Sequence, residues 1–359
     1  MSGISTKRPH FEVMDELKQK LGSIMNVIPK SRPVIYLDYP MHGNIGDLLI
    51  HAGTDRFFAD YNYDVIGRFS IHEFCLCHRP GKPLVFFKDS VRRLDALVKT
   101  GATIVFHGGG NLGDIYPDYQ MFRELVIARY PDAPIVILPQ SVHFENQANR
   151  AAVAKVFAAH PKLFIFARDQ ESLDFARTDC GCSAALMPDM AHSLWGSLPR
   201  HDSNDTRRLN IRRRDPEAVA GLAEPTTTFD WDEVISPFDL FLLRLLRKTQ
   251  SIDTPTRHIV PNYMVWGWYR DYLLRRSIRL VAGYGRVDTD RLHGMILGAL
   301  LDMPIICQDN SYGKISRYYR DWFSASDRIV CRVRRKVPTA EPAPQTPASA
   351  MGALREYGI

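Results

Sequence analysis

Residues 289–294, Thr-Asp-Arg-Leu-His-Gly, place a permanent cation and a titratable imidazole at the expected start of a helix. Thr289 or Asp290 can cap this helix, so that Arg291 and His293 fall in its first turn. The free N–H groups and the dipole of a first turn favour an anion. The pattern therefore indicates anion binding combined with acid catalysis. The alternative is that Arg291 forms an N-terminal salt bridge beside a structural histidine.

Two glycine-containing loops follow predicted strands earlier in the chain. In residues 40–47 two glycines flank Asn44, which permits close backbone approach to a ligand, and Asp47 lies at a helix N-terminus. Either residue could instead serve only as a helix cap. In residues 107–114 the run Gly108–Gly110 predicts a sharp turn that a ligand can reach. This run could cradle phosphate, but it lacks the pattern of a P-loop or of a dinucleotide fingerprint.

Charged residues near other strand ends are weaker candidates. Arg212 follows the first predicted strand of the second half, and Lys314 lies in a Tyr-Gly-Lys loop. Arg168 and Asp169 form either part of the site or an ion pair between a loop and a helix. Asp189 is a candidate for lining a cleft or for closing the first half.

The elements that must position these loops are short apolar runs alternating with helix-like segments. Continuous β-branched runs separated by helices favour a parallel sheet covered on both faces, which is a doubly wound α/β fold. The expected strands are residues 34–37, 83–87, 103–106, 135–138, 163–166, 208–211, 258–260, 278–282 and 304–307. The expected helices are residues 12–28, 47–59, 91–99, 119–130, 145–159, 170–177, 237–248, 264–276 and 290–301.

A polar segment at residues 198–206 divides this alternation. We predict an N-terminal helical extension, two doubly wound Rossmann-like α/β domains that face a cleft, and a Pro/Ala-rich disordered tail. Their boundaries are 1–31, 32–199, 206–336 and 337–359. Ligands bind beyond the carboxyl ends of strands in open parallel sheets, so the three loops should meet in the cleft.

Composition limits the class of protein. The 359 residues are 45% hydrophobic and 24% charged, which is typical of a globular chain and excludes collagen-like or fully disordered ones. Neither a spanning run of apolar residues nor a secretory signal is present, so we expect a cytoplasmic protein. The net charge of +6 is scattered, which argues against nucleic acid as a partner. The six cysteines lack zinc-site spacing, so no metal is predicted.

Residues 238–248 form an amphipathic helix that carries both leucines and cations. Such a helix can touch a membrane surface. The alternative, which is more common, is that its apolar stripe packs on a sheet.

Five motifs in order resemble the polysaccharide pyruvyl transferase family, especially its bacterial exopolysaccharide branch. They are Asn44-x-Gly46-Asp47, His107-Gly-Gly-Gly-Asn111, Arg168-Asp169-x-x-Ser172, Pro188-Asp189 and Arg291-Leu292-His293-Gly294. The resemblance covers about residues 32–330. It implies two domains in a GT-B-like arrangement, with the acceptor on the N-terminal side and the donor on the C-terminal side.

The resemblance also implies a reaction. A pyruvyl group moves from phosphoenolpyruvate to a sugar of an exopolysaccharide or of its lipid-linked repeat unit, forming a cyclic ketal and releasing phosphate. The implied partners are phosphoenolpyruvate and the sugar or lipid-linked oligosaccharide. A peripheral contact at the inner membrane face is kept as an alternative to a purely cytoplasmic location. No cofactor is expected besides the donor substrate.

The resemblance implies donor binding and catalysis for Arg291 and His293 and a place in the cleft for Asn44, Gly46 and Asp47. Residue type and position suggest the remaining roles. His293 and Asp47 are the catalytic candidates. The donor-binding candidates are Arg291, Arg212, Leu292 and Lys314. The acceptor side of the cleft holds Asn44, Gly46, His107, Gly109, Gly110, Asn111 and Asp189. Since Arg212 begins a run of three arginines, Arg213 or Arg214 could take its place.

The chemistry agrees with these residue types. Phosphoenolpyruvate carries a phosphate and a carboxylate, so its site needs fixed cations. Histidine, which changes charge near neutral pH, suits the proton donor, and an acidic group such as Asp47 could accept a hydroxyl proton. Two alternatives remain at this point: a GT-B glycosyltransferase that uses a nucleotide-sugar, or a non-catalytic member of an export complex.

Overall fold

A computed structural model of the chain describes residues 7–76, 85–201, 205–212, 228–250, 262–309 and 313–332. Several predictions lie outside these residues and are not tested by them. They are the strand at 258–260, the alternative arginines Arg213 and Arg214, and the tail at 337–359.

The first half of the chain is an α/β unit built on a seven-stranded parallel sheet. Its strand order is β2-β1-β5-β7-β8-β9, and β6 pairs with β7 beyond the end of β5. The strands are β1 (Val34–Leu37), β2 (Val65–Phe69), β5 (Thr103–Phe106), β6 (Gly109–Gly113), β7 (Ile135–His143), β8 (Leu163–Ala167) and β9 (Ser183–Leu186).

Helices flank this sheet because both of its faces are apolar. Val34 and Tyr36 enter one hydrophobic cluster, while Ile35 and Leu37 enter another on the opposite face. The flanking helices are α2 (Ile45–Asp60), α3 (Lys88–Val98), α4 (Pro117–Arg129), α5 (Gln147–Ala158) and α6 (Gln170–Asp174). A short antiparallel pair, β3 (Cys75–Leu76) and β4 (Val85–Phe86), lies apart from the main sheet.

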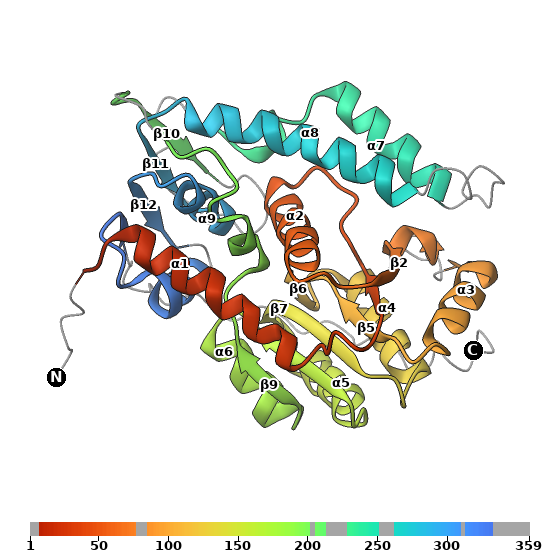
Figure 1. Cartoon of the computed structure of the whole chain (residues 1–359). Coiled ribbons are helices and arrows are strands. Elements are labelled where there is room, and N and C mark those ends of the chain that lie inside the picture. The colour runs from red at the N-terminus through yellow and green to blue at the C-terminus, as the bar shows by residue number, and fades with distance from the viewer. Residues whose placement is uncertain are drawn as a thin grey trace.

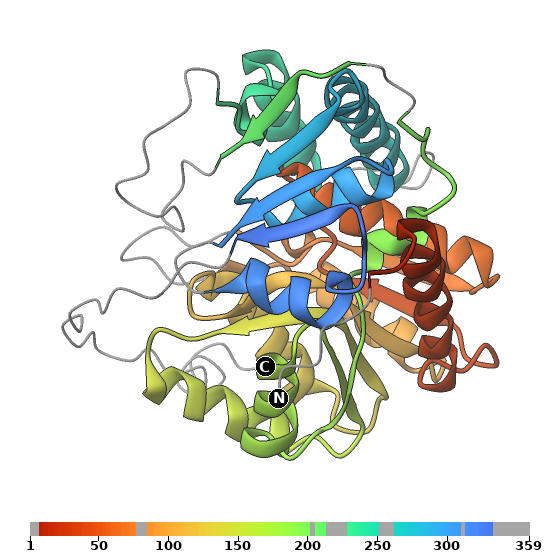
Figure 2. The same ribbon diagram turned by 90° about the vertical axis from the view of Figure 1, so that its left-hand side faces the viewer.

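The second half contains a four-stranded parallel sheet in the order β10-β11-β12-β13. Figure 2 shows its strands as green-to-blue arrows above the yellow part of the larger sheet. The strands are β10 (Arg208–Ile211), β11 (Arg286–Thr289), β12 (Ile305–Gln308) and β13 (Ile329–Arg332). The accompanying helices are α7 (Pro237–Gln250), α8 (Asn262–Ala282), α9 (Leu292–Leu300) and α10 (Lys314–Tyr318).

The helix α1 (His10–Leu21) ties the beginning of the chain to its second half. The His10 imidazole donates from Nε2 to the carbonyl of Ala299 at 2.9 Å, and its Nδ1 lies 2.8 Å from Ser326 Oγ. Asp15 accepts a hydrogen bond from the Trp195 indole at 2.7 Å. In Figure 1 this red helix runs from the blue C-terminal elements toward the middle of the molecule.

One prediction of secondary structure is wrong. Residues 278–282, predicted as a strand, are the last turns of α8. Their apolar side chains continue the helical spacing of Trp266, Leu273 and Leu274, and Ile278 and Val281 are buried on that same face. The strand follows instead at Arg286–Thr289, where Val287 is the lone aliphatic residue.

Two loops also differ from expectation. The glycine run after β5 is not a simple turn, because Gly109–Gly113 forms strand β6 beside β7. The helix expected from residue 290 begins at Leu292, with Arg291 at the N-cap position. The cause is a local turn, in which the Thr289 hydroxyl accepts the backbone N–H of Arg291 at 3.0 Å.

Candidate active site

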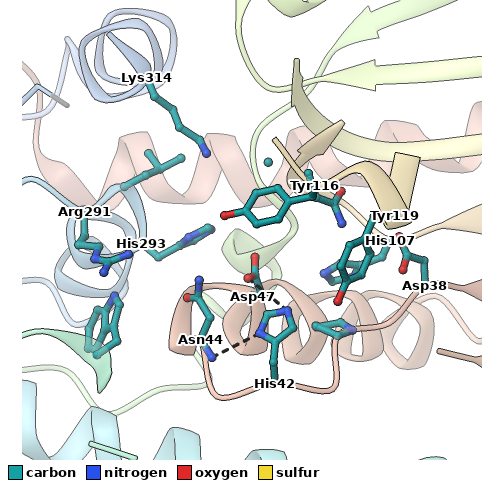
Figure 3. A pocket seen from close by; sticks show the side chains of 15 residues that line it. Asp38, His42, Asn44, Asp47, His107, Tyr116, Tyr119, Arg291, His293 and Lys314 are labelled. Atoms are coloured by element: carbon teal, nitrogen blue, oxygen red, sulfur yellow. Dashed lines mark hydrogen bonds and ion pairs between the residues drawn. The ribbon is translucent and has the colours of Figure 1, made fainter. Parts of the chain in front are cut away.

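A pocket of about 270 Å³ opens where the carboxyl ends of strands from both sheets meet. Figure 3 shows residues of the C-terminal half, such as Lys314 and His293, on one side and Asp38 and His107 on the other. Nine of the predicted site residues line this pocket: Asn44, Asp47, His107, Gly110, Asn111, Arg291, Leu292, His293 and Lys314. The three loops singled out in the sequence therefore converge on one cavity.

The other predicted residues lie around the pocket or away from it. Gly46 and Gly109 adjoin it, and Asp189 is buried beside His293. Arg212 is not among the lining residues. Its guanidinium donates to Asp288 Oδ1 at 2.6 Å, so its role toward the donor stays a prediction.

The imidazole of His293 is held by a buried carboxylate. Its Nε2 lies 3.3 Å from Asp189 Oδ2, and the Asp189 side chain is fully buried. Burial alone would raise the pKa of Asp189, but Arg168 and His293 hold it well below its usual range. Asp189 is therefore a fixed anion that orients His293 and leaves Nδ1 as the ring nitrogen not bonded to it.

Gly46 makes room for that imidazole. A Cβ on Gly46 would lie 2.3 Å from His293 Nδ1, which no side chain could tolerate without moving the ring. The neighbouring Asn44 caps α2, since its Oδ1 accepts the backbone N–H of Gly46 at 3.0 Å. Asn44 therefore caps α2 and also lines the pocket.

Two cations converge on Gly110. A Cβ on this glycine would lie 2.4 Å from Lys314 Nζ and 3.1 Å from Arg168 Nη2. Arg168 is fully buried, and its Nη1 donates to Asp189 at 2.5 Å. Among the described residues its Nη2 finds no hydrogen-bond partner. A buried guanidinium nitrogen without a partner, next to a lysine at a glycine-lined cavity, is suited to an anion.

The pairing of Arg168 departs from the loop-to-helix ion pair considered in the sequence. Arg168 pairs with Asp189, whereas Asp169 caps α6 through the backbone N–H of Ser172 at 2.9 Å. In the motif Arg168-Asp169, Arg168 therefore belongs to the site, whereas Asp169 stabilises the start of α6.

Arg291 forms the salt bridge that was the alternative to ligand binding, and it also lines the pocket. Its Nε and Nη2 donate to the two oxygens of Asp230 at 2.9 and 2.6 Å. Asp230 is 1% exposed. It was missed in the sequence because it stands 61 residues before Arg291, in a segment without a motif.

Asp38 is a second residue that the sequence analysis missed. It follows β1 directly, lines the pocket and has a φ of 66°, in a region that non-glycine residues seldom adopt. Burial raises its pKa to about 7, with Asp47 acting in the same direction and Arg123 and Asn111 in the opposite one. Arg123 Nη2 lies 3.6 Å from its Oδ2. A carboxyl group that titrates near neutrality can take up or release a proton. The position of Asp38 just beyond a buried strand is the sequence feature that could have identified it as a site residue.

Two histidines complete this side of the pocket. The Tyr36 hydroxyl lies 2.6 Å from His107 Nδ1, and burial lowers the pKa of His107 to about 3. His107 is therefore a neutral imidazole. His42 Nε2 lies 3.6 Å from Asp47 Oδ2, and burial lowers the pKa of His42 despite that carboxylate.

Two further features concern the described ranges alone, namely metal-ligand clusters and membrane-spanning helices. No group of three or more His, Cys, Asp or Glu side chains there could hold a metal ion. None of the helices in those ranges combines the length and the apolar character that crossing a bilayer needs.

Comparisons with known proteins agree with the geometry. A family model for polysaccharide pyruvyl transferase matches residues 44–312. The chain is 35% identical over 328 residues to EpsO of Bacillus subtilis, whose name places it among the pyruvyl transferases, covering 90% of this chain and 96% of that protein. It is 25% identical over 307 residues to Pyruvyl transferase 1 of Schizosaccharomyces pombe, covering 81% and 70% respectively.

The fold has a counterpart among solved structures. A functionally uncharacterised protein of Klebsiella pneumoniae superposes with a TM-score of 0.55 at 19% identity, over 88% of this chain and 98% of that one. This likeness concerns the fold alone. The family model spans most of the chain, and the match to EpsO covers both proteins nearly end to end. The chain belongs to the polysaccharide pyruvyl transferase family.

Proposed function

We propose that this protein transfers a pyruvyl group from phosphoenolpyruvate to a sugar of an exopolysaccharide or of its lipid-linked repeat unit. The observation that carries the proposal is the division of one pocket into two chemistries. Arg291 and Lys314 line the pocket and the buried Arg168 lies beside its residue Gly110, while Asp38 and Asp47 lie on the side formed by β1 and α2. Fixed cations suit an anionic donor, and carboxyl groups suit the hydroxyls of a sugar.

The reaction balances without an added cofactor. The methylene carbon of phosphoenolpyruvate takes up a proton, which makes C2 electrophilic. One sugar hydroxyl then bonds to C2, and a second hydroxyl of the same sugar displaces phosphate from that carbon. One of the two hydroxyl protons restores the acid that protonated the methylene carbon. The other hydroxyl proton leaves with the phosphate.

We assign the protonation of the donor to His293. Asp189 accepts from its Nε2, so the proton for the methylene carbon comes from Nδ1. Arg291, Leu292 and Lys314 bind the donor in this scheme. Arg212 is retained as a donor-binding candidate.

The two hydroxyl protons need acceptors on the opposite side. Asp47 takes one, as the sequence suggested, and Asp38 takes the other. The pKa of about 7 at Asp38 supports this role, because such a carboxyl is ionised in part at neutral pH and returns its proton readily. His107 and Asn111 position the sugar beside them.

The overall arrangement is proposed on the same basis. The regions 32–199 and 206–336 would act as two Rossmann-like domains of GT-B type, with the acceptor held by the first and the donor by the second. The lining of the pocket by both halves of the chain supports this division.

The test is phosphorus NMR of the purified chain with phosphoenolpyruvate and a panel of synthetic and lipid-linked oligosaccharides. We expect the phosphoenolpyruvate signal to decrease and inorganic phosphate to appear only when an acceptor is present, with a ketal methyl signal in the proton spectrum. The variant His293→Gln should slow this conversion by about 10²–10⁴-fold. Release of a nucleoside diphosphate from a sugar nucleotide, without conversion of phosphoenolpyruvate, would instead identify a glycosyltransferase.

A further inference from the structure

Helices α7 and α8 carry most of the exposed apolar surface of the described chain. The described residues include eleven large apolar side chains that are exposed. Three of them lie outside α7 and α8, namely Phe11, Tyr116 and Val330. The other eight define what we call the α7–α8 surface: Phe238, Leu240, Phe241, Leu245, Tyr263, Met264, Trp268 and Tyr272. Figure 1 shows both helices along one side of the molecule.

The exposed side chains follow the spacing of helix faces that point away from the core. On α7, Phe238 and Phe241 are 69% and 61% exposed, while Leu243 is buried. On α8, Trp268 is 64% exposed, and Trp266 is fully buried. The inner side of α7 therefore packs on the protein, as expected for residues 238–248. Its outer side, with Phe238 and Phe241, is uncovered.

The charge on these two helices is strongly positive. Their sequences hold seven Arg and Lys residues against two Asp, a difference of +5. Both carboxylates are engaged: Asp239 is buried and accepts from Arg276 at 2.6 Å, and Asp271 accepts from Arg270 at 2.9 Å. The exposed cations Arg244, Lys248, Arg275 and Arg279 accompany the aromatic residues.

The α7–α8 surface adjoins the pocket. Arg247 of α7 donates from Nε to the carbonyl of Met41 at 2.5 Å, and Met41 lies between the pocket residues Pro40 and His42. Trp231, which also lines the pocket, precedes α7 by a short segment. A membrane or macromolecule bound to the α7–α8 surface would therefore lie near the loop that contributes Pro40 and His42 to the pocket.

We propose that the α7–α8 surface binds an anionic membrane. Aromatic and leucine side chains enter the region between headgroups and acyl chains, and the surrounding cations meet lipid phosphates. We choose a membrane over a protein partner on charge, because the two helices hold seven cations against two carboxylates and an anionic bilayer is the complementary surface. The inference goes beyond the pyruvyl transfer and does not depend on it.

The test is co-sedimentation of the full chain with vesicles of phosphatidylcholine, with and without added phosphatidylglycerol. We expect binding to the mixed vesicles, weakened by salt. The double variant Phe241→Ser with Trp268→Ser should reduce the partition coefficient by about 10-fold for each side chain removed. Arg244→Glu with Arg275→Glu should reduce it by at least about 5-fold for each charge.

Matched controls come from other exposed positions. Phe11→Ser on α1, where the phenyl ring is 49% exposed, and Arg92→Glu on α3 should bind vesicles like the parent chain. Melting curves of all variants should coincide, because each altered side chain is exposed. Failure of the parent chain to bind the mixed vesicles would overturn the proposal, and so would equal binding by surface and control variants. A dimer in analytical ultracentrifugation that is lost in Phe241→Ser with Trp268→Ser would show that a second copy covers this surface instead.

Discussion

At the scale of single residues, the side chains proposed to bind or react also carry part of the fold. Arg291 lines the pocket and at the same time neutralises the buried carboxylate of Asp230 through two hydrogen bonds. Asp38 lines the pocket in a left-handed conformation with a carboxyl group removed from water. Substitutions at such residues change stability and function together, so each test must measure both.

The first prediction separates the two roles of Arg291. Arg291→Ala should weaken phosphoenolpyruvate binding by about 10–150-fold, since a charge-assisted contact worth about 1.5–3 kcal/mol is lost. It should also lower the free energy of unfolding by about 3–5 kcal/mol, because the buried Asp230 carboxylate loses its two hydrogen bonds from Arg291. Calorimetric titration and urea unfolding measure the two effects.

The double variant Arg291→Ala with Asp230→Ala supplies the control for that prediction. It should recover most of the lost stability but none of the donor affinity. Recovery of both would mean that Arg291 acts on the donor only through the fold.

The second prediction concerns Asp38 and pH. The pKa of Asp38 is about 7 in the folded protein and about 3.8 in the unfolded chain. At any pH between these two values, unfolding therefore releases the proton of the Asp38 carboxyl group. The contribution of Asp38 to the free energy of unfolding is therefore greatest below about pH 4. It falls by up to about 4 kcal/mol as the pH rises through 7. Asp38→Asn should remove this decline and be more stable than the parent at pH 8.

The same substitution should have the opposite effect on turnover. If ionised Asp38 accepts a hydroxyl proton, kcat rises as pH passes 7, and Asp38→Asn loses both this rise and about 10²–10⁴-fold in kcat. Arg123, Asn111 and Asp47 are the groups that face Asp38, so the rise should shift when Arg123 is changed. Asp64→Asn, at an exposed position, is the control. A variant at Asp38 that keeps the rise would assign it to another group.

At the scale of elements, the sequence predicted strands well where apolar and β-branched residues follow one another without interruption. Val34–Leu37 and Thr103–Phe106 were confirmed for this reason, as each is buried on both faces. Arg286–Thr289 was missed because its buried residues include Asp288 and Thr289, which pair with other polar groups. Residues 278–282 were mistaken for a strand because five residues are too few to distinguish the two periods.

The third prediction tests how closely α2 and α9 approach each other. Gly46→Ala should lower kcat by about 10²-fold, because its Cβ displaces the His293 ring by a fraction of an ångström or more. The fold should persist, since alanine is a good helix former. Gly267→Ala on α8 is the matched control, because its Cβ meets nothing within 4 Å and should leave kcat unchanged. Equal kcat values in both variants would show that His293 has room to move.

At the scale of the whole molecule, the pocket and one hydrophobic core are shared by both sheets. The core that contains Val34 and Leu48 continues through Leu209 and Ile296 to Ile329. The site residues that the sequence revealed lie in glycine-rich or helix-initiating motifs. Asp230, which the sequence did not reveal, meets Arg291 only through this long-range packing, which no local pattern records, whereas Asp38 could have been found from its position just beyond a buried strand.

The fourth prediction follows from the proposed donor site, which Arg291 and Lys314 line. Phosphoenolpyruvate at 100 times its dissociation constant should stabilise the folded protein by about 2.7 kcal/mol, seen as a higher Tm. A uridine or guanosine sugar nucleotide should leave Tm unchanged. Lys314→Ala should reduce the shift, whereas Lys99→Ala, at an exposed position outside the pocket, should preserve it. A shift with the nucleotide alone would contradict the proposed donor.

The attachment of α1 to the second half has a consequence for how the protein is made. His10 meets partners that follow it by 289 and 316 residues. At about 5–20 residues per second, a ribosome needs roughly 15–60 s to deliver them. During that interval Val13, Met14 and Leu17, which are buried in the finished protein, have left the ribosome before the surfaces that cover them exist. Helix α1 can thus complete its contacts with the C-terminal half only after nearly all of the described chain has been made.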